Sequence, residues 1–365
     1  MHTSTVPERA FPPPALRRGA ELLLLGVIPV VALALALSAY AGDGRLALDF
    51  HEELYPQANA VVHGETPYPP AGSEITDTTN AIWPIAAVLP AVPLTALSAK
   101  QADWAATGLV LACLFGTLWV LGVRDWRIYG VTLLWPSVID AYQTANLTLA
   151  LGLLLAVAWR YRERELLAGI AVGTAIAMKF FLWPVAVWLL AIRKRWAAAA
   201  AVAVAAASLL LLLPYIGLRD YVGLVRRLAD AFDGLSYTPY ALVLDLGAPS
   251  AVARSVSVAL GALLLAGAWR RRSLGLALAG AFCLSPIVWR HFFALLVVPL
   301  GIARPRLDAA WLVPLGMWMG TGTFNGAPWQ TAVVLTLVGL TVALAERPPP
   351  GRDRALSASA VPADA

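Results

Sequence analysis

The chain has 365 residues, of which 59% are hydrophobic and 13% are charged, and its formal net charge is +5. Because ordinary soluble domains contain about 25% charged residues, this composition excludes a soluble globular protein and predicts a polytopic membrane protein. The basic residues occur in short clusters between apolar segments rather than in a stripe with interleaved aromatic residues, so we expect no nucleic-acid partner. Cys113 and Cys283 both lie in apolar segments, which favours neither a disulfide nor a cysteine-based metal site.

The N-terminal region consists of a polar tail and a long apolar segment. Residues 1–19 are rich in proline and charge, which predicts a disordered cytoplasmic tail. The apolar segment 22–41 is long enough to cross about 30 Å of hydrocarbon and longer than the roughly 7–15 apolar residues of a signal peptide, so we interpret it as a retained first helix. We expect residues 20–345 to form a single transmembrane catalytic domain and 346–365 to be a second disordered cytoplasmic tail.

Two polar stretches are predicted to be external loops, residues 42–80 and residues 214–248. Each contains apolar residues at helical spacing, which predicts a short amphipathic helix lying at the membrane interface. The apolar stripe of the first loop consists of Leu54, Ala58, Val61 and Val62, and that of the second consists of Tyr221, Leu224, Val225, Leu228 and Phe232.

The basic clusters set the expected topology. Placing all of them in the cytoplasm puts the turns that are poor in lysine and arginine on the outer face. The apolar segment 81–98 contains Pro84, Pro90 and Pro93, and the topology is consistent only if this segment is broken or re-entrant. The predicted fold is an all-α bundle of about 12 transmembrane helices with both termini in the cytoplasm.

Two isolated charges lie where apolar segments meet the outer face. Asp49 follows Leu48 and precedes Phe50, so apolar surroundings could raise its pKa and make it a stronger base; an ordinary loop or capping carboxylate is the alternative. Lys179 has apolar residues on both sides. It either pairs with an anionic lipid headgroup or extends to the interface without a partner.

Further polar candidates occur at other predicted outer turns. Arg290 and His291 could bind phosphate oxygens, although a turn in an aromatic belt would look the same. Gln143 and Asn146 could hydrogen-bond sugar hydroxyls, but helix capping by Asn146 is an equal alternative. Tyr68 either lines the same site or is solvated.

The sequence contains no zinc-protease, Cys-x-x-Cys, P-loop or Gly-x-Ser-x-Gly motif. Asp43 and Asp49 are too far apart for an Asp-x-Asp metal motif, which argues against a nucleotide-sugar donor. We therefore expect no metal and no other cofactor.

The segment LDFHEELYPQANAVVHGETPYPP, which contains Asp49, resembles the first external loop of glycosyltransferase family 87. This family comprises C-type, polyprenyl-phosphate-sugar-dependent membrane enzymes and includes mannosyltransferases. The resemblance covers residues 20–305, because further short motifs follow in the same order as in the family. These motifs are Gly64 to Tyr68, Pro84 to Pro93, Tyr142-Gln143 to Asn146, Ala177-Met178-Lys179 and Ser285-Pro286 to His291. The chain departs from the family pattern at three places: Tyr142 replaces a glycine, Phe180 replaces a proline, and Ala81-Ile82-Trp83-Pro84 replaces Tyr-Pro-Pro.

The resemblance implies a C-type glycosyltransferase at the outer face of a bacterial plasma membrane. It would transfer a hexose, with mannose expected, from a polyprenyl-phosphate donor to a lipid or glycan acceptor, with inversion of configuration. Asp49 would be the general base, and Lys179, Arg290 and His291 would bind the donor phosphate. Tyr68, Gln143 and Asn146 would contact substrate.

The alternative is a transporter or flippase of a lipid-linked sugar. Such a protein should contain paired broken helices in two repeated halves. The sequence shows one proline-broken segment, 84–93, without a convincing counterpart.

Overall fold

The computed structural model describes residues 14–76 and 82–347, and within these residues every regular element is a helix. In this described part of the chain, four helices are long and apolar enough to cross a membrane, and a bent helix pair can supply a fifth crossing. Seven shorter apolar helices accompany them. The all-helical, membrane-type fold is confirmed, whereas the count of about 12 crossings stays a prediction. The four long helices are Ala15–Gly42, Ala99–Val120, Ser250–Arg271 and Pro328–Glu346.

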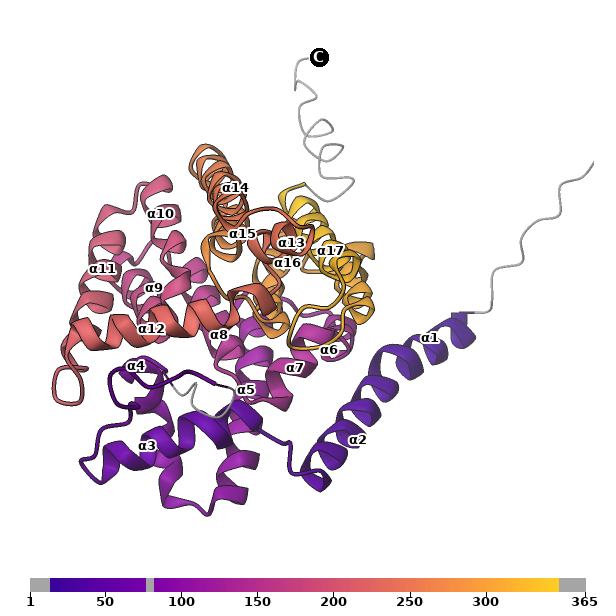
Figure 1. Ribbon diagram of the computed structural model, residues 1–365. Coiled ribbons are helices and arrows are strands. Elements are labelled where there is room, and N and C mark those ends of the chain that lie inside the picture. The colour runs from indigo at the N-terminus through magenta and orange to yellow at the C-terminus, as the bar shows by residue number, and fades with distance from the viewer. Residues whose placement is uncertain (1–13, 77–81, 348–365) are drawn as a thin grey trace, which may run out of the picture.

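The N-terminal helices form one rod at the edge of the molecule (Figure 1), and the middle of this rod packs closely against the chain at Gly130. The rod begins at Pro14, so residues 14–19 are helical although we expected them in the disordered tail; residues 1–13 and 348–365 lie outside the described part. The helix starts early because Ala, Leu, Arg and Glu, which favour helices, make up most of the segment ALRRGAEL. The rod comprises α1 (Pro14–Leu22), the π-helical η1 (Leu23–Val27) and α2 (Ile28–Gly42).

The first predicted external loop folds into short helices, after which comes the proline-containing segment. That segment, Ile85–Ala96, would extend only about 20 Å at 1.5–2.0 Å per residue, which is less than the ~30 Å of hydrocarbon. It therefore does not cross as a single helix, in agreement with the expected broken segment. The elements of this region are η2 (Phe50–Leu54), α3 (Tyr55–Val62), α4 (Ile85–Val88), η3 (Leu89–Ala96) and α5 (Ala99–Val120).

The middle of the chain is built around a broken helix. The helices α7 and α8 are bent by 114° at the intervening residues 144–147. Irregular backbone inside an apolar bundle is tolerated where it is buried in protein or lines a cavity, so the break marks a candidate site. The helices here are α6 (Trp126–Leu133), α7 (Pro136–Gln143), α8 (Thr148–Arg160), α9 (Glu165–Met178), η4 (Phe180–Leu182), α10 (Pro184–Ala191) and α11 (Arg195–Leu210).

Close packing of α9 against α11 depends on small residues. A Cβ atom on Gly169 would lie 2.4 Å from the carbonyl oxygen of Ala197, and one on Gly173 would lie 2.7 Å from that of Ala201. These distances are too short for any side chain, so the two backbones touch through a Gly-x-x-x-Gly face, as is common between helices in membranes. The contact fixes the end of α9, which carries Lys179.

The second predicted external loop contains the amphipathic α12, which lies between α9–α11 and α3–α4 in Figure 1. Its predicted apolar stripe is confirmed, because Tyr221, Leu224 and Phe232 are buried. The stripe predicted in the first loop is partly wrong: Leu54 and Ala58 are buried, but Val62 is 52% exposed. The remaining elements are α12 (Leu218–Phe232), η5 (Asp233–Leu235), α13 (Pro239–Asp245), α14 (Ser250–Arg271), α15 (Leu274–Leu284), η6 (Arg290–Leu296), α16 (Val297–Ala303), η7 (Ala309–Met319) and α17 (Pro328–Glu346).

A buried ion pair joins α7 to η6. The guanidinium of Arg290 donates from Nε and Nη2 to the two carboxylate oxygens of Asp140, at 2.7 and 2.8 Å. Both residues are less than 9% exposed. Such bidentate geometry is specific, and it fixes the turn that carries His291 against the helix that leads into the break at residues 144–147.

We predict that Asp140→Leu or Arg290→Met alone lowers the free energy of unfolding by about 3–5 kcal/mol, because each leaves an unpaired buried charge. The double variant should lose much less than the sum of the two single variants. Thermal unfolding in detergent measures this cycle, and Glu163→Gln, which alters a mostly exposed ion pair, is the control. Additive losses in the double variant would mean that the pair does not act as a unit.

Candidate functional site

The loop that carries Asp49 is attached to the break between α7 and α8 by backbone hydrogen bonds. Ala47 N donates to Gln143 O at 2.7 Å, and Phe50 N donates to Thr144 O at 3.2 Å. The side-chain amide of Gln143 also donates to the carbonyl oxygen of Arg45, at 3.4 Å. Two segments about a hundred residues apart in sequence therefore hold Asp49 in place.

Both of these segments contain an alanine in the left-handed region. Ala47 has φ +57° and Ala145 has φ +48°. This conformation costs an ordinary L-residue about 1–2 kcal/mol, and it persists where the surrounding structure requires it, often at functional sites. Ala47 precedes Asp49 by two residues and Ala145 directly precedes Asn146, so the strain is located at the candidate site.

The Asn146 side chain connects the two predicted charges. Its Nδ2 donates to Asp49 Oδ2 at 2.6 Å, and its Oδ1 accepts from Lys179 Nζ at 3.1 Å. The backbone N–H and the hydroxyl of Thr148 donate to the same Oδ1, at 3.1 and 2.9 Å. Because a backbone N–H can only donate, the Thr148 contact fixes which end of the amide faces Asp49.

The environment of Asp49 favours its protonated form more than water does. Burial raises the pKa of this carboxyl group, and the hydrogen bond from Asn146 and the charge of Lys179 oppose that rise. The net effect is a pKa above the usual range of an aspartate. A carboxylate of this kind is a stronger base than an exposed one.

Lys179 lies on the wall of a cavity of about 370 Å³ between α12, η4 and the segment after α15. Its ammonium group lies 3.8 Å from the centroid of the Phe292 ring and 4.7 Å from that of Trp83. The rest of the wall is almost entirely apolar. It includes Phe180, Phe181, Tyr221, Val225, Leu228, Phe232 and Trp289.

A second carboxylate, Glu53, lines the same cavity and was not predicted, because the sequence places it on the polar side of an amphipathic segment. Its carboxylate accepts a hydrogen bond from Nε1 of Trp83. Burial raises the pKa of Glu53, and the nearby charge of Asp49 raises it further. The only sequence signal for this residue is its position four residues after Asp49, one helical turn away.

The predicted substrate residues Tyr68 and Gln143 both hydrogen-bond to backbone. The hydroxyl of Tyr68 donates to Trp83 O at 3.1 Å, and its ring packs edge-on against Tyr221, with centroids 5.3 Å apart. Tyr221 in turn donates to Ile82 O at 3.3 Å. These contacts position Trp83 in the cavity wall.

Arg290 and His291 directly precede Phe292, whose ring contacts Lys179, but neither of them lines the cavity. The Asp140 carboxylate occupies the guanidinium of Arg290, as described above. His291 is 1% exposed, its ring lies 4.9 Å from that of Phe292, and neither of its nitrogens has a hydrogen-bond partner among the described residues. The structure thus brings Asp49, Asn146 and Lys179 into one hydrogen-bonded chain, to which Arg290 and His291 do not belong.

Among the described residues, no three or more His, Cys, Asp or Glu side chains lie close enough together to hold a metal ion.

Comparison with known proteins places the chain in a family. The model of glycosyltransferase family 87 matches residues 82–299, which is more than half of the chain. No curated protein and no solved structure gives a significant match. The matched range contains Asn146, Lys179, Arg290 and His291, whereas Asp49 precedes it and is tied to it by the hydrogen bond to Asn146. The protein, a membrane-type helical chain, belongs to glycosyltransferase family 87.

Proposed function

We propose that the protein transfers a hexose, with mannose as the expected sugar, from a polyprenyl-phosphate carrier to a hydroxyl group of a lipid or glycan acceptor. The reaction takes place at the outer face of a bacterial plasma membrane and inverts the configuration of the sugar. The observation that carries this proposal is the hydrogen-bonded chain Asp49–Asn146–Lys179, whose Lys179 end lies at the wall of an apolar cavity.

Asp49 is the proposed general base. The acceptor hydroxyl attacks the anomeric carbon while its proton moves to the Asp49 carboxylate. The hydrogen bond from Asn146 engages Oδ2, so Oδ1 is the oxygen that receives the proton. The bond between the anomeric carbon and the phosphate oxygen breaks on the opposite side, and its electron pair leaves with the phosphate.

Lys179 is the proposed partner of the leaving phosphate. Its ammonium group stabilises the charge that develops on the phosphate oxygen as the glycosidic bond breaks. In the described part of the chain no ion pair joins Lys179 to Asp49; the Asn146 amide lies between them. An inverting reaction needs base and leaving group on opposite faces of the sugar, so the proposal requires Lys179 to reach the phosphate from the face opposite Asp49.

The apolar cavity next to Lys179 is the proposed site for the first isoprene units of the carrier. Its aromatic and branched walls can bury a hydrocarbon chain, and α12 covers it with its apolar stripe. Arg290 contributes by fixing η6 through Asp140, and His291 packs against the Phe292 ring that contacts Lys179.

We predict that Asp49→Asn lowers the rate of sugar transfer by about 10²–10⁴, the usual contribution of a general base. The assay supplies labelled polyprenyl-phosphate mannose and membrane lipid extract as the acceptor pool, and measures label in other lipids. Asp43→Asn, an exposed carboxylate in the same loop, should transfer at the native rate. Full activity of Asp49→Asn would refute the assignment of Asp49 as the base. If the native protein moved the carrier across liposome membranes but transferred no sugar, the proposal that it is a transferase would be refuted.

The raised pKa of Asp49 predicts the pH dependence of transfer. The base must be deprotonated, so kcat/KM falls as the pH drops through the pKa of Asp49 in the free enzyme. Because burial raises that pKa, the fall should begin well above pH ~3.9, the value for an exposed aspartate. A pH–rate profile that stays flat down to that value would contradict this environment.

Glu53 provides a separate test, because its raised pKa favours the neutral carboxyl group. Glu53→Gln keeps an acceptor for Trp83 Nε1 without a charge, so we expect near-native transfer. Glu53→Ala frees the Trp83 ring beside Lys179 and should lower kcat/KM by up to about 10²-fold, as misplacement near reacting groups does. Equal losses in both variants would show that a charged Glu53 is needed.

A further inference from the structure

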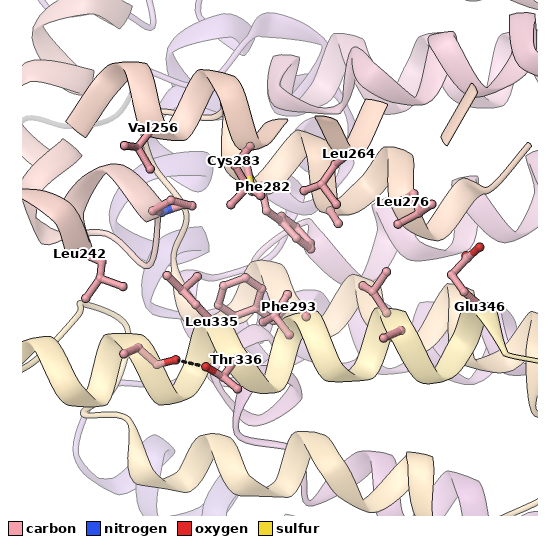
Figure 2. A pocket seen from close by; sticks show the side chains of 18 of the residues that line it. Leu242, Val256, Leu264, Leu276, Phe282, Cys283, Phe293, Leu335, Thr336 and Glu346 are labelled. Atoms are coloured by element: carbon pink, nitrogen blue, oxygen red, sulfur yellow. Dashed lines mark hydrogen bonds between the residues drawn. The ribbon is translucent and has the colours of Figure 1, made fainter. Parts of the chain in front are cut away.

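A second cavity lies between α14, α15 and α17, outside the site described above. Its volume is about 730 Å³, within the range of about 300–1,000 Å³ typical of pockets that hold small molecules and cofactors. Figure 2 shows side chains of α14 and α15 facing those of α17, with Leu242 at one end and Glu346 at the other. Leu264, Leu276 and Leu335 lie between these ends, so most of the wall is hydrocarbon.

The cavity is long in the direction of the membrane-spanning helices. Its lining on α14 runs from Val256 to Arg271, which corresponds to about 22 Å at 1.5 Å per residue. Its lining on α17 covers a similar length, from Ala332 to Glu346. Both helices are long and apolar enough to cross a membrane, so the cavity follows most of the ~30 Å hydrocarbon layer. This shape fits an acyl chain.

One end of the cavity carries a net positive charge. Arg271 and Arg347 line it and are exposed, and the adjacent Arg270 and Arg272 add to the positive charge. The acid at this end, Glu346, accepts a hydrogen bond from the hydroxyl of Ser273. The arginines can therefore attract an anionic group held at the mouth of the cavity.

An aromatic layer separates this cavity from the one beside Lys179. Phe282 and Phe293 line the second cavity, and their ring centroids are 5.2 Å apart. Phe181 lies against Phe282 at 6.2 Å and stacks on Phe292 at 4.8 Å, and both Phe181 and Phe292 line the first cavity. A ligand in the second cavity would support this layer from behind.

We propose that the second cavity binds a glycerophospholipid with an anionic headgroup. One acyl chain lies along the apolar wall between α14 and α17, and the phosphate lies at Arg271 and Arg347. Lipid binding in this cavity requires no sugar transfer, so it can be tested independently of the reaction proposed above.

Photo-cross-linking of the full-length protein in phosphatidylcholine vesicles tests the proposal. The probe is phosphatidylglycerol with a diazirine on its acyl chain, and mass spectrometry maps the labelled peptides. We expect label on α14 and α17 that unlabelled phosphatidylglycerol displaces and extra phosphatidylcholine does not.

The arginines at the mouth of the cavity can be tested in the same experiment. Arg271→Gln or Arg347→Gln should each lower the preference for phosphatidylglycerol over phosphatidylcholine about fivefold. Arg195→Gln changes an exposed arginine outside the cavity and should leave this preference unchanged. Equal competition by the two lipids would mean annular lipid only and would overturn the proposal.

Gly339 allows the cavity to be filled without disturbing the fold. It lines the cavity, and a Cβ atom added there meets nothing within 4 Å. Leucine also favours the helix more than glycine does, so Gly339→Leu should fold normally. We expect this variant to lose the phosphatidylglycerol label while its unfolding temperature is not lowered. Native labelling of Gly339→Leu would place the lipid elsewhere.

Discussion

The side-chain amide of Asn146 is the contact on which the site depends. It donates to Asp49 and accepts from Lys179, so the carboxylate and the ammonium are held close without an ion pair between them. A direct pair would neutralise the base and occupy the cation at the same time. The break between α7 and α8, the strained Ala145 and the hydrogen bonds to Thr148 all serve to hold this amide in one orientation.

The surroundings of this contact divide into rigid supports and apolar cavities. The Asp140–Arg290 pair and the close packing of α9 on α11 fix the segments that bring His291 and Lys179 toward the break. The aromatic layer around Phe292 separates two cavities with different charged features, Glu53 and Lys179 in the first and arginines in the second. Apolar walls with one charged region suit lipids that carry a phosphate. Membership of glycosyltransferase family 87 indicates that the reaction is sugar transfer.

The sequence predicts the parts of this arrangement that have a local signal. Asp49 and Lys179 stand out as isolated charges beside apolar segments, and the stripe of α12 follows from helical spacing, so burial of Tyr221 was predictable. Contacts between distant segments carry no such signal. Arg290 looked like a free cation because its partner Asp140 lies 150 residues earlier. Glu53 was not singled out, because its partner Trp83 comes thirty residues later.

An experimental structure with a non-cleavable polyprenyl-phosphonate sugar bound tests the central claim most directly. The account predicts a phosphonate oxygen within hydrogen-bond distance of Lys179 Nζ, the isoprene chain in the cavity under α12, and Asp49 on the opposite face of the sugar. A phosphonate bound away from Lys179, or a sugar with Asp49 and Lys179 on the same face, would contradict it.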